Sequence, residues 1–145
     1  MIRHNNYFLG LIMKTVAKRQ ESFMRAILLV LLFSFLIVSG QVLWKLAIDK
    51  NGGLINRDYT AIQNFWNLLL SPYMLFGIGI YMFATVFWMY LLGEYEYSFI
   101  YPMSSMTFVM SLFFASYVFD EEITLYKIIG VLIIILGVFI VTKGK

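Results

Sequence analysis

Three polar residues lie on one face of the first long apolar segment, residues 27–48, and have the chemistry to bind a ligand. Ser34, Gln41 and Lys45 are separated by seven and four residues. On a helix of 3.6 residues per turn these intervals place them within roughly 40° of one another. An ammonium group near the end of an apolar segment, with an amide one turn further in, can bind an anionic or polar headgroup. The alternative is a lysine that snorkels to the membrane surface and a glutamine that hydrogen-bonds to a neighbouring helix.

Two later apolar segments carry stripes of small, hydroxyl-bearing and aromatic residues. These are Gly77, Tyr81, Thr85 and Trp88 in the second, and Tyr101, Ser104, Ser111 and Ala115 in the third. Such stripes either pack helices closely together or converge on a wet cavity with aromatic walls. Pro102 favours the cavity, because its missing N–H frees a carbonyl group and permits a kink.

Residue types that support enzymatic chemistry are scarce. No apolar segment has an Asp or Glu near its centre, the single histidine is His4, and the chain contains no cysteine. The sequence also has no phosphate-binding glycine loop, no Ser-His-Asp set and no cluster with metal-ligand spacing. We therefore expect no enzymatic activity, no cofactor and no metal.

The elements that position these residues are membrane-spanning helices. The chain has 145 residues, 61% of them hydrophobic and only 13% charged, and its mean hydropathy is +0.82. A membrane-spanning helix needs about 20 apolar residues, so roughly four such helices use most of the chain. The sequence predicts an all-α polytopic membrane protein, a bundle of four transmembrane helices at about residues 26–48, 68–92, 98–119 and 124–142.

The basic residues indicate an orientation rather than a nucleic-acid partner. The net charge is +3, and the Lys and Arg residues lie at the chain ends and helix margins. With both termini inside the cell, seven of them are inside and four are outside, which favours an N-in, C-in orientation. Without residues 1–23 the count is three against four, so on this interpretation the tail decides the orientation.

Residues 1–23 differ in character from the transmembrane domain, residues 24–145. They mix apolar with basic residues, a pattern typical of a basic amphipathic segment on an anionic membrane surface. The alternative interpretation is that this tail lies upstream of a natural beginning at Met24.

The fourth segment carries Gly130 and Gly137 seven residues apart, on one stripe of an otherwise bulky aliphatic helix. This pattern predicts a docking surface for another helix. It serves either a neighbouring helix of the same protomer or a second subunit, and we favour a dimer.

The order of these features resembles the drug/metabolite transporter superfamily in its four-helix, half-size form, over roughly residues 24–143. The motifs that carry the resemblance are residues 39–45 (SGQVLWK), 87–88 (FW), 97–103 (YSFIYPM), and 119–124 (FDEEIT) running into 128–130 (IIG). The glycine pair is similar to the fourth-helix dimer motif of small multidrug resistance transporters.

Two subgroups of the superfamily compete. Small multidrug resistance exporters use a first-helix glutamate that would fall near Ile37, and a third-helix tryptophan where this chain has Ser104. Tyr101 matches their tyrosine. The Ser-Gly-Gln-x-x-x-Lys segment is closer to the half-size subunits that flip undecaprenyl-phosphate-linked aminoarabinose across the bacterial inner membrane.

The resemblance implies a transporter subunit that flips a lipid-linked sugar or similar amphiphile in the inner membrane as a homodimer, or as a heterodimer with another half-size subunit. In this interpretation Lys45 holds the headgroup, while Gln41 and Tyr101 hydrogen-bond to it. Tyr81 and Trp88 line the wall, and Ser104 belongs to the same site. The alternatives are an exporter of small drugs or metabolites and, in another class, a membrane scaffold that transports nothing.

Overall fold

The protein is entirely helical in the part that the structure describes. The computed structural model describes the backbone of residues 2–55 and 59–143, and the side chains of Lys14, 20–55 and 59–142. Six helices follow one another in these ranges: α1 (Ile2–Lys50), α2 (Ala61–Leu69), α3 (Pro72–Glu94), α4 (Tyr97–Met103), α5 (Met106–Phe119) and α6 (Leu125–Lys143). The predicted all-α fold class is confirmed.

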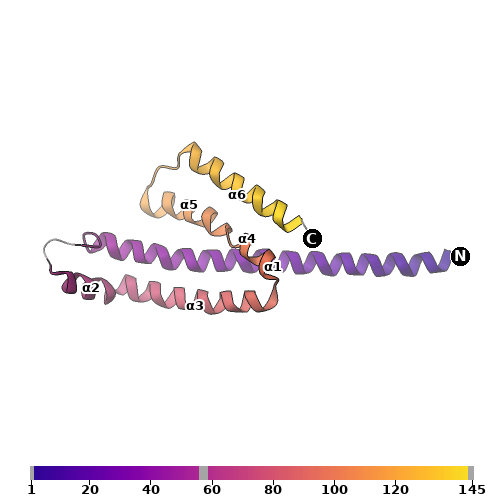
Figure 1. Ribbon diagram of the computed structural model, residues 1–145, viewed down its shortest axis with the longest axis horizontal. Coiled ribbons are helices and arrows are strands. Elements are labelled where there is room, and N and C mark those ends of the chain that lie inside the picture. Colours follow the sequence, from indigo (N-terminus) through magenta and orange to yellow (C-terminus); the bar gives the residue numbers. More distant parts are fainter. Residues whose placement is uncertain (1, 56–58, 144–145) are drawn as a thin grey trace.

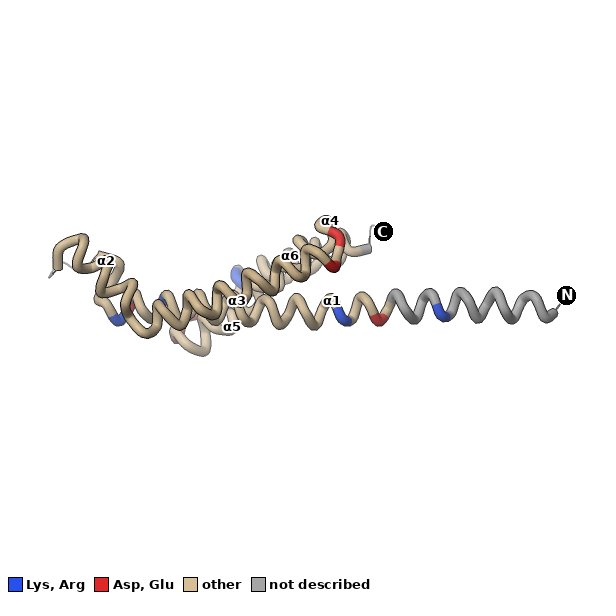
Figure 2. The backbone as a smooth tube through the Cα atoms, turned by 90° about the horizontal axis from the view of Figure 1, so that it is seen from below, with Lys and Arg blue, Asp and Glu red and all other residues tan. Residues whose placement is uncertain are grey.

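Four stretches of helix within the described residues are long and apolar enough to cross a membrane. They are Gln20–Lys50, Pro72–Glu94, Tyr97–Phe119 and Leu125–Thr142. Charged residues are sparse along this bundle and gather toward the helix ends (Figure 2). The prediction of a polytopic membrane protein is thereby confirmed.

The boundaries of the second and third spans differ from the expected ones. The second span begins at Pro72 rather than near residue 68, because the Ser71 hydroxyl caps the backbone N–H of Met74 and Pro72 fits the first helical position. Leu68 and Leu69 belong instead to α2, whose first turn Thr60 and Gln63 close as a capping box. The third span is divided into α4 and α5 after Pro102.

The N-terminal residues continue α1 without a break. The helix runs from Ile2 to Lys50, and its first part extends past the ends of the other helices (Figure 1). Most side chains of the predicted amphipathic tail lie outside the described residues, so its predicted membrane-surface role remains a prediction.

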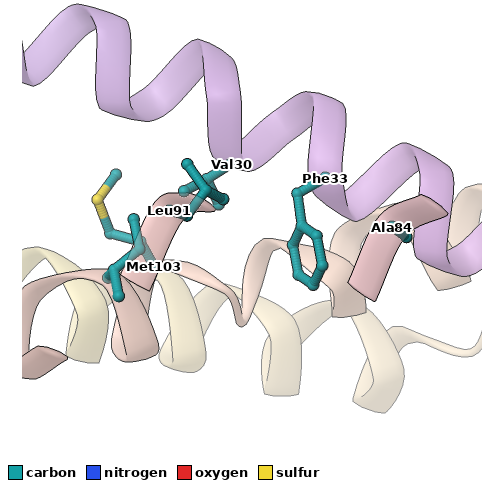
Figure 3. Packing of buried hydrophobic residues seen from close by; sticks show 6 residues of the cluster. Val30, Phe33, Ala84, Leu91 and Met103 are labelled. Carbon is teal, nitrogen blue, oxygen red and sulfur yellow. The ribbon is translucent and has the colours of Figure 1, made fainter. Parts of the chain in front are cut away.

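The core of the protein lies between α1, α3 and α4. Val30 and Phe33 of α1 belong to one buried cluster with Leu91 of α3 and Met103 of α4, and both point from the same side of α1 toward the neighbouring helices (Figure 3). Near the other end of this contact Gly40 and Gly77 bring the backbones of α1 and α3 together. A Cβ atom at Gly77 would lie 2.9 Å from the carbonyl oxygen of Gly40, so only glycine permits this approach.

Helix α6 lies at the outside of the bundle. It contacts α4 and α5 (Figure 1), and none of its residues in the membrane-spanning window is buried. Apart from the side on which Val138 packs against the core, the helix is open to lipid or to another chain.

Candidate functional site

A cavity of about 660 Å³ lies between α1, α3 and the α4–α5 segment. Its volume is in the range typical of small-molecule sites. The residues that line it are Phe33, Ile37, Val38, Gln41, Tyr81, Thr85, Trp88, Tyr101, Ser104, Thr107, Phe108 and Ser111. Five of the six predicted ligand-binding residues, Gln41, Tyr81, Trp88, Tyr101 and Ser104, are thus brought together around one space.

The helical repeat explains how these side chains reach the same cavity. Phe33, Ile37 and Gln41 are spaced by four residues along α1, and Tyr81, Thr85 and Trp88 by four and three along α3, so each set shares a face. On the third side, the break after Pro102 tightens the backbone: the N–H of Ser105 donates to the carbonyl of Pro102 at 3.2 Å. This turn leads from Tyr101 on α4 into the wall formed by α5.

Four small hydroxyl side chains line the cavity, and each donates its proton to a backbone carbonyl three or four residues earlier in the chain. Thr85 donates to Tyr81 at 2.9 Å. Ser104 donates to Tyr101 at 2.7 Å, and Thr107 donates to Ser104 at 2.8 Å. Ser111 makes the equivalent bond to Phe108 at 2.9 Å. The cavity wall therefore carries hydrogen-bond acceptors within a largely apolar surface, and none of its residues is ionisable at neutral pH.

Aromatic rings fix the rest of the wall. Trp88 stacks on Phe33 with ring centroids 4.7 Å apart and meets Tyr101 edge-on at 5.3 Å. Tyr81 stacks on Trp44 at 4.8 Å. Such contacts stabilise each ring in one orientation, so the cavity has preformed aromatic surfaces.

Lys45 does not line the cavity. Its ammonium group donates a hydrogen bond to the Glu121 carboxylate, in the loop before α6, and lies 3.9 Å from the centroid of the Phe119 ring. The hydrogen bond and the positive charge of Lys45 hold the pKa of Glu121 below its usual value, and Lys127 adds to the effect. The side chains are 45% and 40% exposed, so water and salt screen the pair.

The polar stripe of the first span is thus divided among three environments. Gln41 reaches the cavity and Lys45 pairs with Glu121. Ser34 is completely buried, and its hydroxyl has no hydrogen-bond partner among the described residues. Glu121 belongs to the motif at residues 119–124. Lys45 and Glu121 both lie at helix ends on the same side of the membrane. This shared position is the feature of the sequence that could have predicted their ion pair.

The predicted glycine stripe of α6 is open. A Cβ atom added at Gly130 or at Gly137 would meet no atom within 4 Å. Neither glycine is used for packing against described residues of the same protomer. Those residues also contain no group of His, Cys, Asp and Glu that could hold a metal ion.

Four apolar spans around an uncharged cavity with hydroxyl and aromatic groups are typical of a small membrane transporter subunit. Comparison with known proteins gives the family. The chain is 32% identical over 111 residues to a protein of Aeromonas hydrophila subsp. hydrophila, a match that covers 77% of this chain and 91% of that protein. It is 30% identical over 118 residues to a protein of Pseudomonas fluorescens, covering 81% and 97%.

Both relatives carry the name "Probable 4-amino-4-deoxy-L-arabinose-phosphoundecaprenol flippase subunit ArnE". No family model and no solved structure matches the chain. The chain belongs to the ArnE family of flippase subunits, which are transporters rather than enzymes. It is a multi-pass protein of the bacterial inner membrane, and the resemblance seen in the sequence motifs is confirmed.

Proposed function

We propose that this chain is one half of a flippase that moves a polyprenyl-phosphate-linked aminosugar between the leaflets of the inner membrane. The observation that supports this proposal is the cavity itself: an uncharged wall that brings hydroxyl, amide and aromatic groups together within an apolar bundle. A headgroup of one sugar fits a space of about 660 Å³. The polyprenyl chain of the same lipid stays in the surrounding hydrocarbon.

Different residues bind the sugar and the phosphate of the headgroup. Gln41, Tyr81, Tyr101 and Ser104 offer hydrogen-bonding groups to the sugar, and Trp88 provides an apolar face for its ring. Lys45 lies one helical turn beyond Gln41, where it can bind the phosphate. Glu121 holds the ammonium group in the absence of substrate, so the phosphate replaces one anionic partner with another.

The transport unit is a dimer in this proposal. A carrier that alternates its access needs two repeats around a central site, and four spans supply one. The open stripe of Gly130 and Gly137 is the surface through which α6 packs against the second subunit, either a copy of this chain or another half-size subunit. The count of Lys and Arg residues favours placing both termini of this chain inside the cell.

The cavity weighs against the two alternatives. A membrane scaffold has no need for a preformed space, yet Gln41 lines one. A proton-coupled exporter of cationic drugs needs a titratable carboxylate in the pathway, and the wall contains none.

Transbilayer movement of the headgroup tests the proposal. The full chain, purified with its co-purifying subunits, is reconstituted into vesicles that contain undecaprenyl-phosphate-linked aminoarabinose. A membrane-impermeant amine reagent then labels only amines that reach the outer leaflet. We expect labelling to proceed to nearly all of the lipid with the protein and to stop at the outer leaflet without it.

A matched pair of variants links the movement to the cavity. Trp88→Leu removes a ring from the cavity wall, whereas Phe83→Leu removes an exposed ring from the same helix. Slow labelling with Trp88→Leu and normal labelling with Phe83→Leu support the proposal. Labelling that stops at the outer leaflet with the complete wild-type complex contradicts it.

A further inference from the structure

The hydroxyl groups of the cavity have a common limitation. A Ser or Thr hydroxyl has one proton and two lone pairs. The four cavity hydroxyls each donate that proton to a backbone carbonyl: Thr85, Ser104, Thr107 and Ser111. What remains on each oxygen is the capacity to accept. A ligand group that contacts these four oxygens must therefore donate a hydrogen bond.

The rest of the wall carries no positive charge that could hold an anion. No lining residue is basic, so a phosphate in this space would face lone pairs without a compensating cation. The electron-rich faces of Tyr81, Trp88 and Tyr101 attract cations instead. The Gln41 amide and the phenol groups of Tyr81 and Tyr101 can both donate and accept hydrogen bonds. The four small hydroxyls can only accept, so acceptor oxygens and ring faces are the more numerous sites for a ligand.

Backbone bonds of this kind are common for Ser and Thr in membrane helices, and they also occur outside the cavity at Ser39, Ser105 and Thr142. The distinctive feature here is convergence. Hydroxyls from α3 and from the α4–α5 segment turn lone pairs toward one space that holds no ionised group. An ammonium ion can be bound there without a carboxylate, whose tight pairing would slow its release.

We propose that the cavity selects its headgroup by hydrogen-bond donors, above all by a protonated amine, and that Thr85, Thr107 and Trp88 set this selectivity. The inference rests on the proposed flippase function and adds an orientation to it. The amine-bearing end of the sugar enters the cavity, and the phosphate stays outside it, near Lys45.

A comparison of two lipids tests this selectivity. One carries undecaprenyl-phosphate-linked aminoarabinose with a free amine, and the other carries the same sugar with the amine N-acetylated and therefore neutral. Both sugars keep a vicinal diol, which a membrane-impermeant oxidant cleaves once the headgroup reaches the outer leaflet. The rate of cleavage therefore measures the movement of either lipid in the same way. With the wild-type complex we expect the free amine to move about fivefold faster or more.

Two substitutions and one control locate the effect. Thr85→Val and Thr107→Val remove a lone-pair oxygen at nearly constant shape, and each is expected to reduce the ratio of the two rates. Ser39→Ala removes the same type of backbone-bonded hydroxyl outside the cavity and should leave the ratio unchanged. Two valine variants are used so that the failure of one to fold leaves the other as the test.

The outcomes separate the inference from the proposed function. Equal rates for the two lipids with the wild-type complex overturn the inference and leave the flippase function intact. The same holds if Ser39→Ala lowers the ratio as much as the valine variants do. If neither lipid moves, the flippase function itself is contradicted.

Discussion

Glycine is used in opposite ways at the α1–α3 contact and on α6. A Cβ atom at Gly77 would lie 2.5 Å from Cδ1 of Trp44, and one at Gly40 would lie 3.2 Å from the carbonyl oxygen of Gly77. Gly130 and Gly137 on α6 have nothing within 4 Å of the same position. A stripe of small residues in sequence therefore marks a helix contact without saying whether the partner is in the same chain.

The difference separates two tasks of the molecule. The inner glycines let Trp44 lie flat on Tyr81, and so they hold one wall of the cavity in place. The outer glycines hold nothing in the described protomer. The inner contact builds the site, and the outer stripe is the proposed place for a second subunit.

The largest expected effect comes from breaking the inner contact. Gly77→Ala forces a methyl group against both the Trp44 ring and the Gly40 backbone, and we expect it to destabilise the protein by about 1–3 kcal/mol. Thermal unfolding of the detergent-solubilised protein, followed by tryptophan fluorescence, measures the loss.

Gly79→Ala is the matched control for this substitution. It lies two residues away on α3, where a Cβ atom meets nothing within 4 Å. It should leave the unfolding temperature unchanged or raise it, because alanine favours a helix over glycine. Equal destabilisation by the two variants would refute the account of the inner contact.

The second effect concerns the outer stripe. Gly137→Leu should leave the unfolding of the protomer unchanged and weaken its association with a second subunit about tenfold or more. Native mass measurement in detergent reads the subunit composition. Gly79→Leu, at an exposed glycine of another helix, is the control. Undiminished association in Gly130→Leu and Gly137→Leu alike would show that this stripe is not the interface.

The third effect lies at the connection between the two regions, where Lys45 of α1 pairs with Glu121 before α6. Lys45→Ala should slow headgroup movement about tenfold or more, because it removes the charge-assisted bond to phosphate. Glu121→Gln removes only the competing anion and should slow it far less. The amine-labelling assay measures both, with Lys127→Ala as a control lysine. Equal losses in the two variants would indicate that the pair itself, rather than the ammonium group, is needed.

The smallest effect is on pH dependence. The pKa of Glu121 is lowered by Lys45 from its ordinary value of 4.5, so the folded carboxylate stays ionised throughout the neutral range. A lowered pKa stabilises the folded protein above the unfolded value, and the contribution is lost as the pH falls through the folded value. The unfolding temperatures of wild type and Glu121→Gln should therefore keep a constant small difference between about pH 6 and pH 8. A difference that changes within this range would contradict the assignment.

Much of the fold could be predicted because membrane spans depend on local composition. Runs of apolar residues determine the four spans, and helical spacing placed Tyr81, Thr85 and Trp88 on one face, which lines the cavity in the structure. Boundaries were harder, because Leu68 and Leu69 are apolar enough for a span. The Ser71-Pro72 pair is what ends α2 and begins α3.

The part that could not be predicted depends on contacts between distant residues. Spacing placed Ser34 and Lys45 on the face of Gln41, but the rotation of α1 against α3 buries Ser34. The partner of Lys45 is 76 residues away, and no periodicity within one helix reveals it. Thr107 was likewise missed, although its spacing from Ser104 and Ser111 by three and four residues would have identified it.

The central claim is that the lipid headgroup occupies the cavity. Protection of a single introduced cysteine from a thiol reagent tests it most directly, because the chain contains no cysteine of its own. Thr107→Cys places a thiol in the cavity wall, and Leu125→Cys places one at the exposed start of α6. A water-soluble maleimide reacts with both in the reconstituted complex. Saturating undecaprenyl-phosphate-linked aminoarabinose should slow the reaction at position 107 and leave position 125 unchanged. An unchanged rate at position 107 would show that the headgroup does not occupy the cavity.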